Sequence, residues 1–268
     1  MKVQYKQMFG RDLVDDLKSE TSGNFEDAIV ALFYTPIDLD VETLYKAMKG
    51  LGTDEDTLIE IIGTRPNHIL KEIVKRYEEL HNEPLEKRLS SELSGDLKKI
   101  MISLIQCNRS ENKNVNEQEM QKKAEELYSA GEGKLGTDES VFNKIFATAS
   151  PEELLSISKH YYKLTGKKST ILDAIEKEFS GDMKKIYKTI VYALISPPEY
   201  YARRIYDAVK GWGTKDTQLI RICVCRDEID LQLIKKYYKT LYNEDLIERI
   251  KSETSGSYRK LLVEVVDH

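Results

Sequence analysis

The sequence has few cysteines, no basic excess and no long hydrophobic run. Its three cysteines are an odd number, and Cys223 and Cys225 lie in the apolar segment LIRICVC, where they are predicted to be buried as small hydrophobic residues. No disulfide framework is indicated, which is typical of a reducing compartment. The formal net charge of −5 argues against nucleic-acid binding and against unaided electrostatic attraction to anionic lipid.

Membrane-spanning and secretory segments are also missing. No apolar stretch approaches the roughly 18 residues that a transmembrane helix needs, and the first ten residues lack the apolar core of a signal peptide. We therefore expect a soluble cytoplasmic protein. With 40% apolar residues, 32% charged residues and only six prolines, the chain is predicted to be globular and helical.

A four-residue motif, Glu-x-Ser-Gly, recurs along the chain. Its four copies begin at Glu20, Glu92, Glu178 and Glu253. The glutamates are separated by 72, 86 and 75 residues, which indicates repeated structural units.

A glycine-rich segment precedes each of the last three tetrads. Its copies are KGLGTD at 49–54, KLGTD at 134–138 and KGWGTK at 210–215. From Gly52, Gly136 and Gly213 to the following tetrad glutamate the distances are 40, 42 and 40 residues. This nearly constant spacing indicates that the two motifs act together in each unit.

Apolar residues within a unit follow a helical period. One stripe consists of Ile69, Leu70, Ile73, Tyr77 and Leu80, and a matching stripe occurs at 229–241. We expect five short helices in each full unit, almost no strand, and a helix break at the Ser-Gly of each tetrad.

Helix starts and connectors can be placed approximately. Thr53, Thr137 and Thr214 each follow a loop glycine and precede an apolar run, so each is predicted to be a helix N-cap. Connectors are predicted at 35–40, 108–117 and 196–199, the last because it contains the pair Pro197-Pro198.

The paired motifs suit calcium. This ion takes six to eight oxygen ligands, including backbone carbonyls and carboxylates. Glycine tolerates positive φ, so a glycine-rich turn can present several carbonyls, and the tetrad glutamate can supply the carboxylate if the two segments lie side by side. A site with one carboxylate is expected to bind calcium weakly and to leave positions for water or a lipid phosphate oxygen. Calcium would then link an acidic protein to an acidic membrane.

The stretches MKGLGTDEDTLIEIIGTR and VKGWGTKDTQLIRICVCR, together with the tetrads, resemble annexin repeats over essentially the whole chain. The resemblance implies an all-α, slightly curved disc of five-helix repeats with calcium loops on its convex face, and calcium-dependent binding to anionic phospholipid. The implied division is a partial repeat one at 1–36, repeat two at 37–108, a linker at 109–119, repeat three at 120–196 and repeat four at 197–268.

Three calcium sites follow from the resemblance, each combining backbone carbonyls with one tetrad carboxylate. The implied ligands are Met48, Gly50, Gly52 and Glu92 in repeat two, Gly131, Lys134, Gly136 and Glu178 in repeat three, and Val209, Gly211, Gly213 and Glu253 in repeat four. Glu55 and Glu139 match weaker accessory sites, where repeat four has the shorter Asp216.

The loop tips are expected to touch lipid. Leu51, Leu135 and Trp212 occupy equivalent loop positions, and tryptophan favours the membrane interface. The loops are flanked by Lys49, Lys134 and Lys210, which are expected either to contact headgroup phosphates or to remain solvated.

The first repeat departs from the pattern. A loop for Glu20 would lie about 40 residues upstream, before Met1. We therefore expect this repeat to lack its first two helices and its loop, to expose Ile29, Leu32 and Phe33, and to make the chain less stable than one with four complete repeats.

Catalytic motifs are not found. The sequence contains no Gly-x-Ser-x-Gly elbow, phosphate-binding loop or His-Glu-x-x-His, and its four histidines lack metal-ligand spacing, so no enzymatic activity is predicted. We predict a peripheral calcium-dependent membrane binder, monomeric in solution and able to assemble laterally on membranes. Two other classes stay open: a calcium-independent helical scaffold for cytoskeletal or other proteins, and a calcium buffer without membrane contact.

Overall fold

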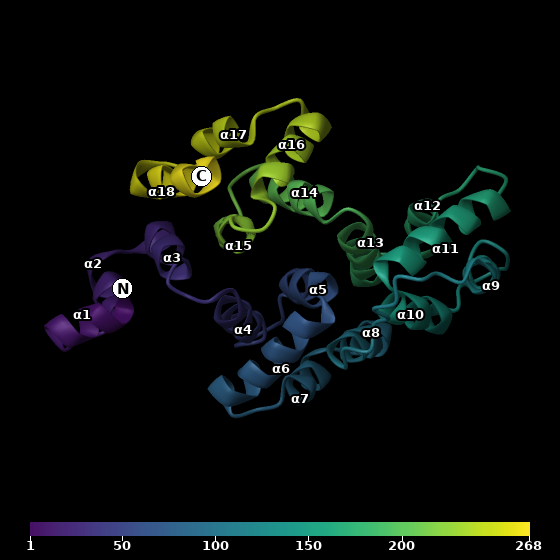
Figure 1. Ribbon diagram of the computed structural model, residues 1–268, viewed down its shortest axis with the longest axis horizontal. Coiled ribbons are helices and arrows are strands. Elements are labelled where there is room, and N and C mark those ends of the chain that lie inside the picture. The colour runs from purple at the N-terminus through teal and green to yellow at the C-terminus, as the bar shows by residue number, and fades with distance from the viewer. The chain divides into compact units, whose positions relative to one another are not determined.

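The protein is entirely helical, as predicted. The computed structural model describes residues 1–268 and contains eighteen α-helices and no β-strand (Figure 1). The helices form two compact units. Residues 40–197 make up the central unit, and residues 1–39 with 198–268 make up the terminal unit. No helix combines the length and the apolar character that crossing a membrane requires.

The central unit consists of two successive sets of five helices. They are α4 (Pro36–Ala47), α5 (Glu55–Thr64), α6 (Asn67–His81), α7 (Leu85–Glu92) and α8 (Gly95–Ile105), then α9 (Glu117–Ala130), α10 (Glu139–Thr148), α11 (Pro151–Leu164), α12 (Ile171–Glu178) and α13 (Gly181–Ile195). The two sets pack on each other mainly through α5 against α13 and α8 against α10.

The terminal unit combines three early helices with a third set of five. They are α1 (Lys2–Phe9), α2 (Leu13–Glu20) and α3 (Gly23–Ala31), then α14 (Pro197–Val209), α15 (Asp216–Arg226), α16 (Leu231–Tyr242), α17 (Leu246–Glu253) and α18 (Gly256–Asp267). Here α3 packs against both α15 and α18. The expected five helices are therefore present in each of the three full repeats.

Two prolines begin helices that were expected to start later. α4 starts at Pro36 and α14 at Pro197, because a fixed φ and a missing N–H suit the first helical turn. The predicted connectors at 35–40 and 196–199 are wrong for this reason. The polar connector near 108–117 is confirmed, since α8 ends at Ile105 and α9 begins at Glu117.

The predicted threonine N-caps are also wrong, each by one residue. The N-caps of α5, α10 and α15 are Asp54, Asp138 and Lys215. Aspartate caps as well as threonine does, and Asp54 accepts a hydrogen bond of 3.1 Å from the Thr57 amide. The threonine hydroxyls are used elsewhere, as described below.

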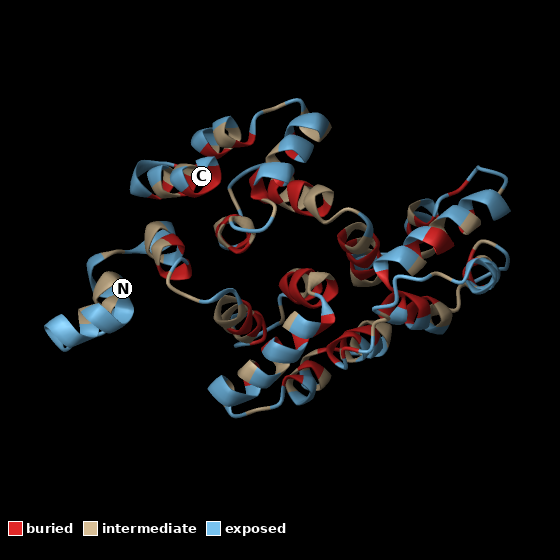
Figure 2. Ribbon diagram, viewed as in Figure 1, coloured by how far each residue is buried: buried red, intermediate tan, exposed pale blue.

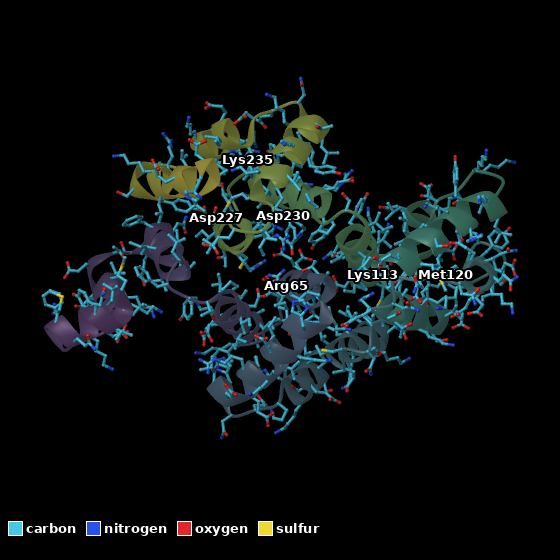
Figure 3. All side chains as sticks on the ribbon, viewed as in Figure 1. Arg65, Lys113, Met120, Asp227, Asp230 and Lys235 are labelled. Carbon is cyan, nitrogen blue, oxygen red and sulfur yellow. The ribbon has the colours of Figure 1, made fainter.

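The contact between α5 and α13 is close. Figure 2 shows buried residues along both helices. A Cβ added to Gly63 of α5 would lie 2.9 Å from Thr189 Cγ2 of α13, so a larger residue would force the helices apart. At the end of α5, the Arg65 guanidinium, labelled in Figure 3, forms a nearly buried ion pair of 2.7 Å with Asp40.

The first repeat exposes several apolar side chains. Leu32 is 41% exposed, whereas Ile29 and Phe33 are partly buried, so the expected exposure is strongest at Leu32. No residue of α1 is buried, and Met8 and Phe9 at its end are 74% and 55% exposed.

Candidate calcium sites

The three glycine loops join the first and second helices of their repeats: α4 to α5, α9 to α10 and α14 to α15. Gly50 and Gly52 have φ of 106° and 89°, and Gly211 and Gly213 have 95° and 87°. Residues with a side chain rarely adopt such angles, so the loops depend on glycine at these positions.

Each loop is closed by a backbone hydrogen bond, and the third-repeat loop is the longest. The Asp54 amide donates to the Ala47 carbonyl over 2.9 Å, and the Lys215 amide donates to Ala208 over 2.8 Å. In repeat three the Asp138 amide reaches back to Ala130 over 2.8 Å, one residue further along the chain. The third loop therefore has one extra residue.

The tetrad glutamates lie against these loops although they are about 40 residues away in sequence. Three threonine hydroxyls make the connection: Thr53 to Glu92 Oε2 at 2.7 Å, Thr137 to Glu178 Oε2 at 2.6 Å, and Thr214 to Glu253 Oε2 at 3.4 Å. The structure thus brings together each loop and the carboxylate that was paired with it from the sequence. The orienting threonines were missed, because their position suggested a helix cap.

Glu178 also packs on its loop directly. A Cβ added to Gly131 would lie 3.2 Å from Glu178 Cγ, so a larger residue here would require the glutamate side chain to shift. The Gly131 carbonyl accepts a hydrogen bond of 3.0 Å from the Lys134 amide, within the longer turn.

Two of the three candidate sites contain an arginine. Arg88 Nη2 donates to the Met48 carbonyl and lies 2.9 Å from Glu92 Oε1. In repeat four, Arg249 Nη2 donates to the Val209 carbonyl over 2.6 Å and lies 3.1 Å from Glu253 Oε1. Repeat three has Ala174 four residues before its glutamate, where the others have arginine. Aligning the tetrads would have revealed this difference.

Repeat three instead has an acidic side chain within its loop, between α9 and α10. Glu132 accepts hydrogen bonds from Tyr161 (2.7 Å), Ser169 (3.1 Å) and Lys177 (2.7 Å). Burial opposes ionisation of Glu132, but these hydrogen bonds outweigh it and hold the pKa of the carboxyl below its ordinary value.

A buried tyrosine hydroxyl lies near the arginine in each of the other two repeats. Tyr77 is fully buried with no hydrogen-bond partner for its hydroxyl, and the same holds for Tyr238. Burial raises the pKa of Tyr77 to about 12, while the charge of Arg88 acts in the opposite direction.

The loop tips project into solvent. Leu51, Leu135 and Trp212 are all fully exposed. Lys49 and Lys210 lie over the rings of Tyr45 and Tyr206, with Nζ 5.4 and 5.5 Å from the ring centroids. A large apolar side chain at each tip is therefore available for contact.

A depression of about 430 Å³ lies between the second and third repeats, within the central unit. Its lining includes the tetrad glutamates Glu92 and Glu178, and the accessory candidates Glu55 and Glu139. No three His, Cys, Asp or Glu side chains converge on a metal position in the protein.

Each candidate site therefore places one carboxylate beside a glycine-rich loop. A carboxylate combined with loop carbonyls would be an all-oxygen donor set, which fits a hard cation such as calcium. In the first repeat, the exposed Glu20 carboxylate forms no hydrogen bond or ion pair, so it is not part of a comparable arrangement.

The sequence matches the family described as Annexin over residues 1–32, 39–104, 122–190 and 200–265. The chain is an annexin. Human annexin A7 is 43% identical over 266 residues, which are 99% of this chain and 54% of annexin A7, so this annexin spans about half the length of that relative.

Solved structures agree with this assignment. Annexin III superposes with a TM-score of 0.95 at 37% identity, covering 100% of this annexin and 82% of that chain. The calcium-bound structure of annexin (Sm)1 superposes with a TM-score of 0.88 at 30% identity, covering 100% of this annexin and 80% of that chain. The predicted family and the all-α annexin fold are confirmed.

Proposed function

We propose that the three loops of this annexin bind calcium through loop carbonyls and the tetrad glutamates, and that lipid phosphate oxygens complete the coordination. The hydrogen bonds from Thr53, Thr137 and Thr214 support this most directly, because they hold each remote carboxylate at its loop. The solved calcium-bound annexin (Sm)1, which shares the fold, supports calcium as the ion.

Different residues coordinate calcium and insert into the lipid. The glutamates and loop carbonyls hold the ion, and a bound calcium supplies the positive charge that a chain of net charge −5 lacks. Leu51, Leu135 and Trp212 then enter the lipid interface, where burying an exposed side chain of this size contributes about 1.5–3 kcal/mol.

The biological setting follows from this chemistry. A protein held by calcium rather than by a membrane span attaches reversibly, so we place it in the cytoplasm and on membranes when calcium rises. Its role is binding rather than catalysis. A calcium-independent scaffold and a calcium buffer are the competing functions, and both make different predictions in a vesicle assay.

The decisive experiment replaces Glu92, Glu178 and Glu253 by Gln together. Sedimentation with phosphatidylserine vesicles is measured with calcium and with chelator, and helicity is followed by circular dichroism. We expect calcium-dependent sedimentation to be lost while helicity is retained. The matched control replaces glutamates of the same three helices, Glu86, Glu176 and Glu248, and should sediment like the unaltered chain.

Other outcomes identify the alternatives. Calcium-dependent sedimentation of the triple tetrad variant would reduce the glutamates to a structural role and overturn the proposal. Sedimentation of the unaltered chain that ignores calcium would favour a scaffold. Calcium binding without any sedimentation would favour a buffer.

A further inference from the structure

An arginine nitrogen lies between two candidate calcium ligands in repeats two and four. Arg249 Nη2 is 2.6 Å from the Val209 carbonyl oxygen and 3.1 Å from Glu253 Oε1. Arg88 contacts Met48 and Glu92 in the same way, with 2.9 Å to the carboxylate. The arrangement occurs in two separate units, so it is a repeated feature of the chain.

We propose that Arg88 and Arg249 act as internal cations that occupy the second and fourth calcium loops when calcium is absent and compete with the ion for them. The third loop, with Ala174 at the corresponding position, binds calcium without this competition and fills first. This inference rests on the proposed function of the loops as calcium sites.

Geometry makes the two cations mutually exclusive. Calcium lies about 2.3–2.6 Å from its oxygen ligands. An ion bound to both Val209 O and Glu253 would therefore lie close to the present position of Arg249 Nη2. Two positive charges cannot share that space, so the guanidinium must leave both oxygens before calcium can bind both.

The carboxylate at the third loop has no cation bound to it. Glu178 accepts one hydrogen bond, from Thr137, and has no ion-pair partner. The nearby Lys177 donates instead to Glu132, 2.7 Å away, which keeps that ammonium from pairing with Glu178. The third carboxylate is thus available without displacing a bound cation.

A purely structural role for the arginines predicts the opposite result. Met48 directly follows α4 and Val209 is the last residue of α14, and carbonyls at helix ends often need a donor. If the arginines only stabilised the loops, their removal would loosen the sites and weaken calcium binding. If they compete, their removal strengthens calcium binding. The sign of the change separates the two roles.

The fourth loop has a built-in probe. Trp212 is the only tryptophan of the chain and lies in this loop, so terbium, a luminescent substitute for calcium, can be excited selectively through it. In a Glu92→Gln, Glu178→Gln background, the substitution Arg249→Met should make terbium bind about three- to tenfold more tightly. The calcium affinity, measured by displacement of the bound terbium, should rise by the same factor. The control Lys251→Met removes a charge from the same helix that pairs only with Glu248, and should change affinity much less.

The second loop provides an independent test by calorimetry with calcium. In a Glu178→Gln, Glu253→Gln background, Arg88→Met should tighten binding similarly, whereas the neighbouring control Lys87→Met should not. Thermal melting provides a second readout. In chelator, both arginine variants should melt at a lower temperature than their parents. Added calcium should raise the melting temperatures of the variants by more than it raises those of their parents.

The outcomes are distinguishable. Unchanged or weaker binding in folded Arg249→Met and Arg88→Met would overturn the inference. If Arg249→Met failed to fold, Arg249→Gln, which keeps a donor for Val209 without the charge, must show the tighter binding instead. A parent chain whose terbium or calcium binding is absent, or is unaffected by Glu253→Gln, would refute the proposed function itself.

Discussion

The Thr137 hydroxyl donates a hydrogen bond of 2.6 Å to the Glu178 carboxylate, across 41 residues of sequence. Equivalent pairs join Thr53 to Glu92 and Thr214 to Glu253. Each threonine follows a glycine of the loop, so it fixes the distance between the loop backbone and the carboxylate. The chain itself therefore holds each carboxylate at its loop.

Replacing Thr137 by Val should weaken calcium binding at the third loop. The hydroxyl orients Glu178, and a hydrogen bond of this kind contributes about 0.5–1.5 kcal/mol, or roughly two- to tenfold in affinity. Calorimetry in a Glu92→Gln, Glu253→Gln background would measure it. Thr148→Val is the matched control, since that hydroxyl donates to the Lys144 carbonyl on the same repeat. Equal or tighter binding by Thr137→Val would show that the hydroxyl does not assist the site.

Replacing Trp212 by Ala should weaken vesicle binding without changing stability. The side chain is fully exposed, so its loss removes no packing, and thermal melts should agree within about 0.5 kcal/mol. Because the variant has no indole to insert into the lipid interface, its affinity for vesicles should be about tenfold lower than that of the parent. Ile229, which is 63% exposed outside the loops, supplies the control Ile229→Ala. Equal losses from both variants would contradict a specific role for the loop tip.

Replacing Arg65 by Met should destabilise the central unit strongly. Arg65 and Asp40 are 9% and 2% exposed, and the guanidinium reaches both carboxylate oxygens, at 2.7 and 2.8 Å. Leaving a buried carboxylate without its partner costs about 3–5 kcal/mol, measurable by urea unfolding. The double variant Asp40→Asn with Arg65→Met should recover part of that loss. A single variant as stable as the parent would mean that water reaches Asp40.

Replacing Asp173 by Asn should reduce stability in a manner that depends on pH. Hydrogen bonds from the Thr170 amide and hydroxyl lower the pKa of Asp173 below its ordinary value. A carboxyl with a lowered folded-state pKa contributes stability that is present above its unfolded pKa of about 3.9 and is lost as the pH falls through the folded value. Because the residue is exposed, the contribution of this cap should be about 0.5–1 kcal/mol.

Thermal melts of the parent and Asp173→Asn over a pH series would test this sign. The difference between them should be constant near neutrality and should shrink below about pH 4. A difference that grows as the solution becomes acidic would show that the carboxylate is not stabilised by the cap.

Much of the fold could be predicted because two independent motifs, the tetrads and the glycine loops, both mark the repeats. Constant spacing between Gly52 and Glu92, and between Gly213 and Glu253, located both partners of a contact without any structural information. Helical spacing likewise identified the buried Ile73 and Tyr77, but Leu80 of the same stripe is 42% exposed, and Ile229 of the matching stripe is 63% exposed.

Helix starts were less predictable because one residue type serves several purposes. Pro36 and Pro197 suggested breaks, yet proline also suits the first turn of a helix. Thr53 suggested a cap, yet its neighbour Asp54 caps the helix and leaves the threonine hydroxyl for Glu92. Local sequence does not decide which of two neighbouring residues caps a helix. That choice depends on the position of a partner that is remote in sequence, here Glu92.

The arginine contacts could not be predicted from hydrophobic pattern or glycine spacing. Arg88 donates to a backbone carbonyl 40 residues earlier in the chain. Every residue has a backbone carbonyl, so the sequence does not indicate which one accepts the hydrogen bond. Only comparison among the repeats distinguishes Arg88 and Arg249 from Ala174.

The alanine at 174 makes the three loops unequal. Identical loops would all fill over one narrow interval of ion concentration, and attachment would switch on abruptly. If Arg88 and Arg249 compete with calcium as proposed, the half-saturation concentrations of the three loops differ. The chain would then bind a bilayer through the third loop at low calcium and through all three loops as calcium rises, which would give a graded response.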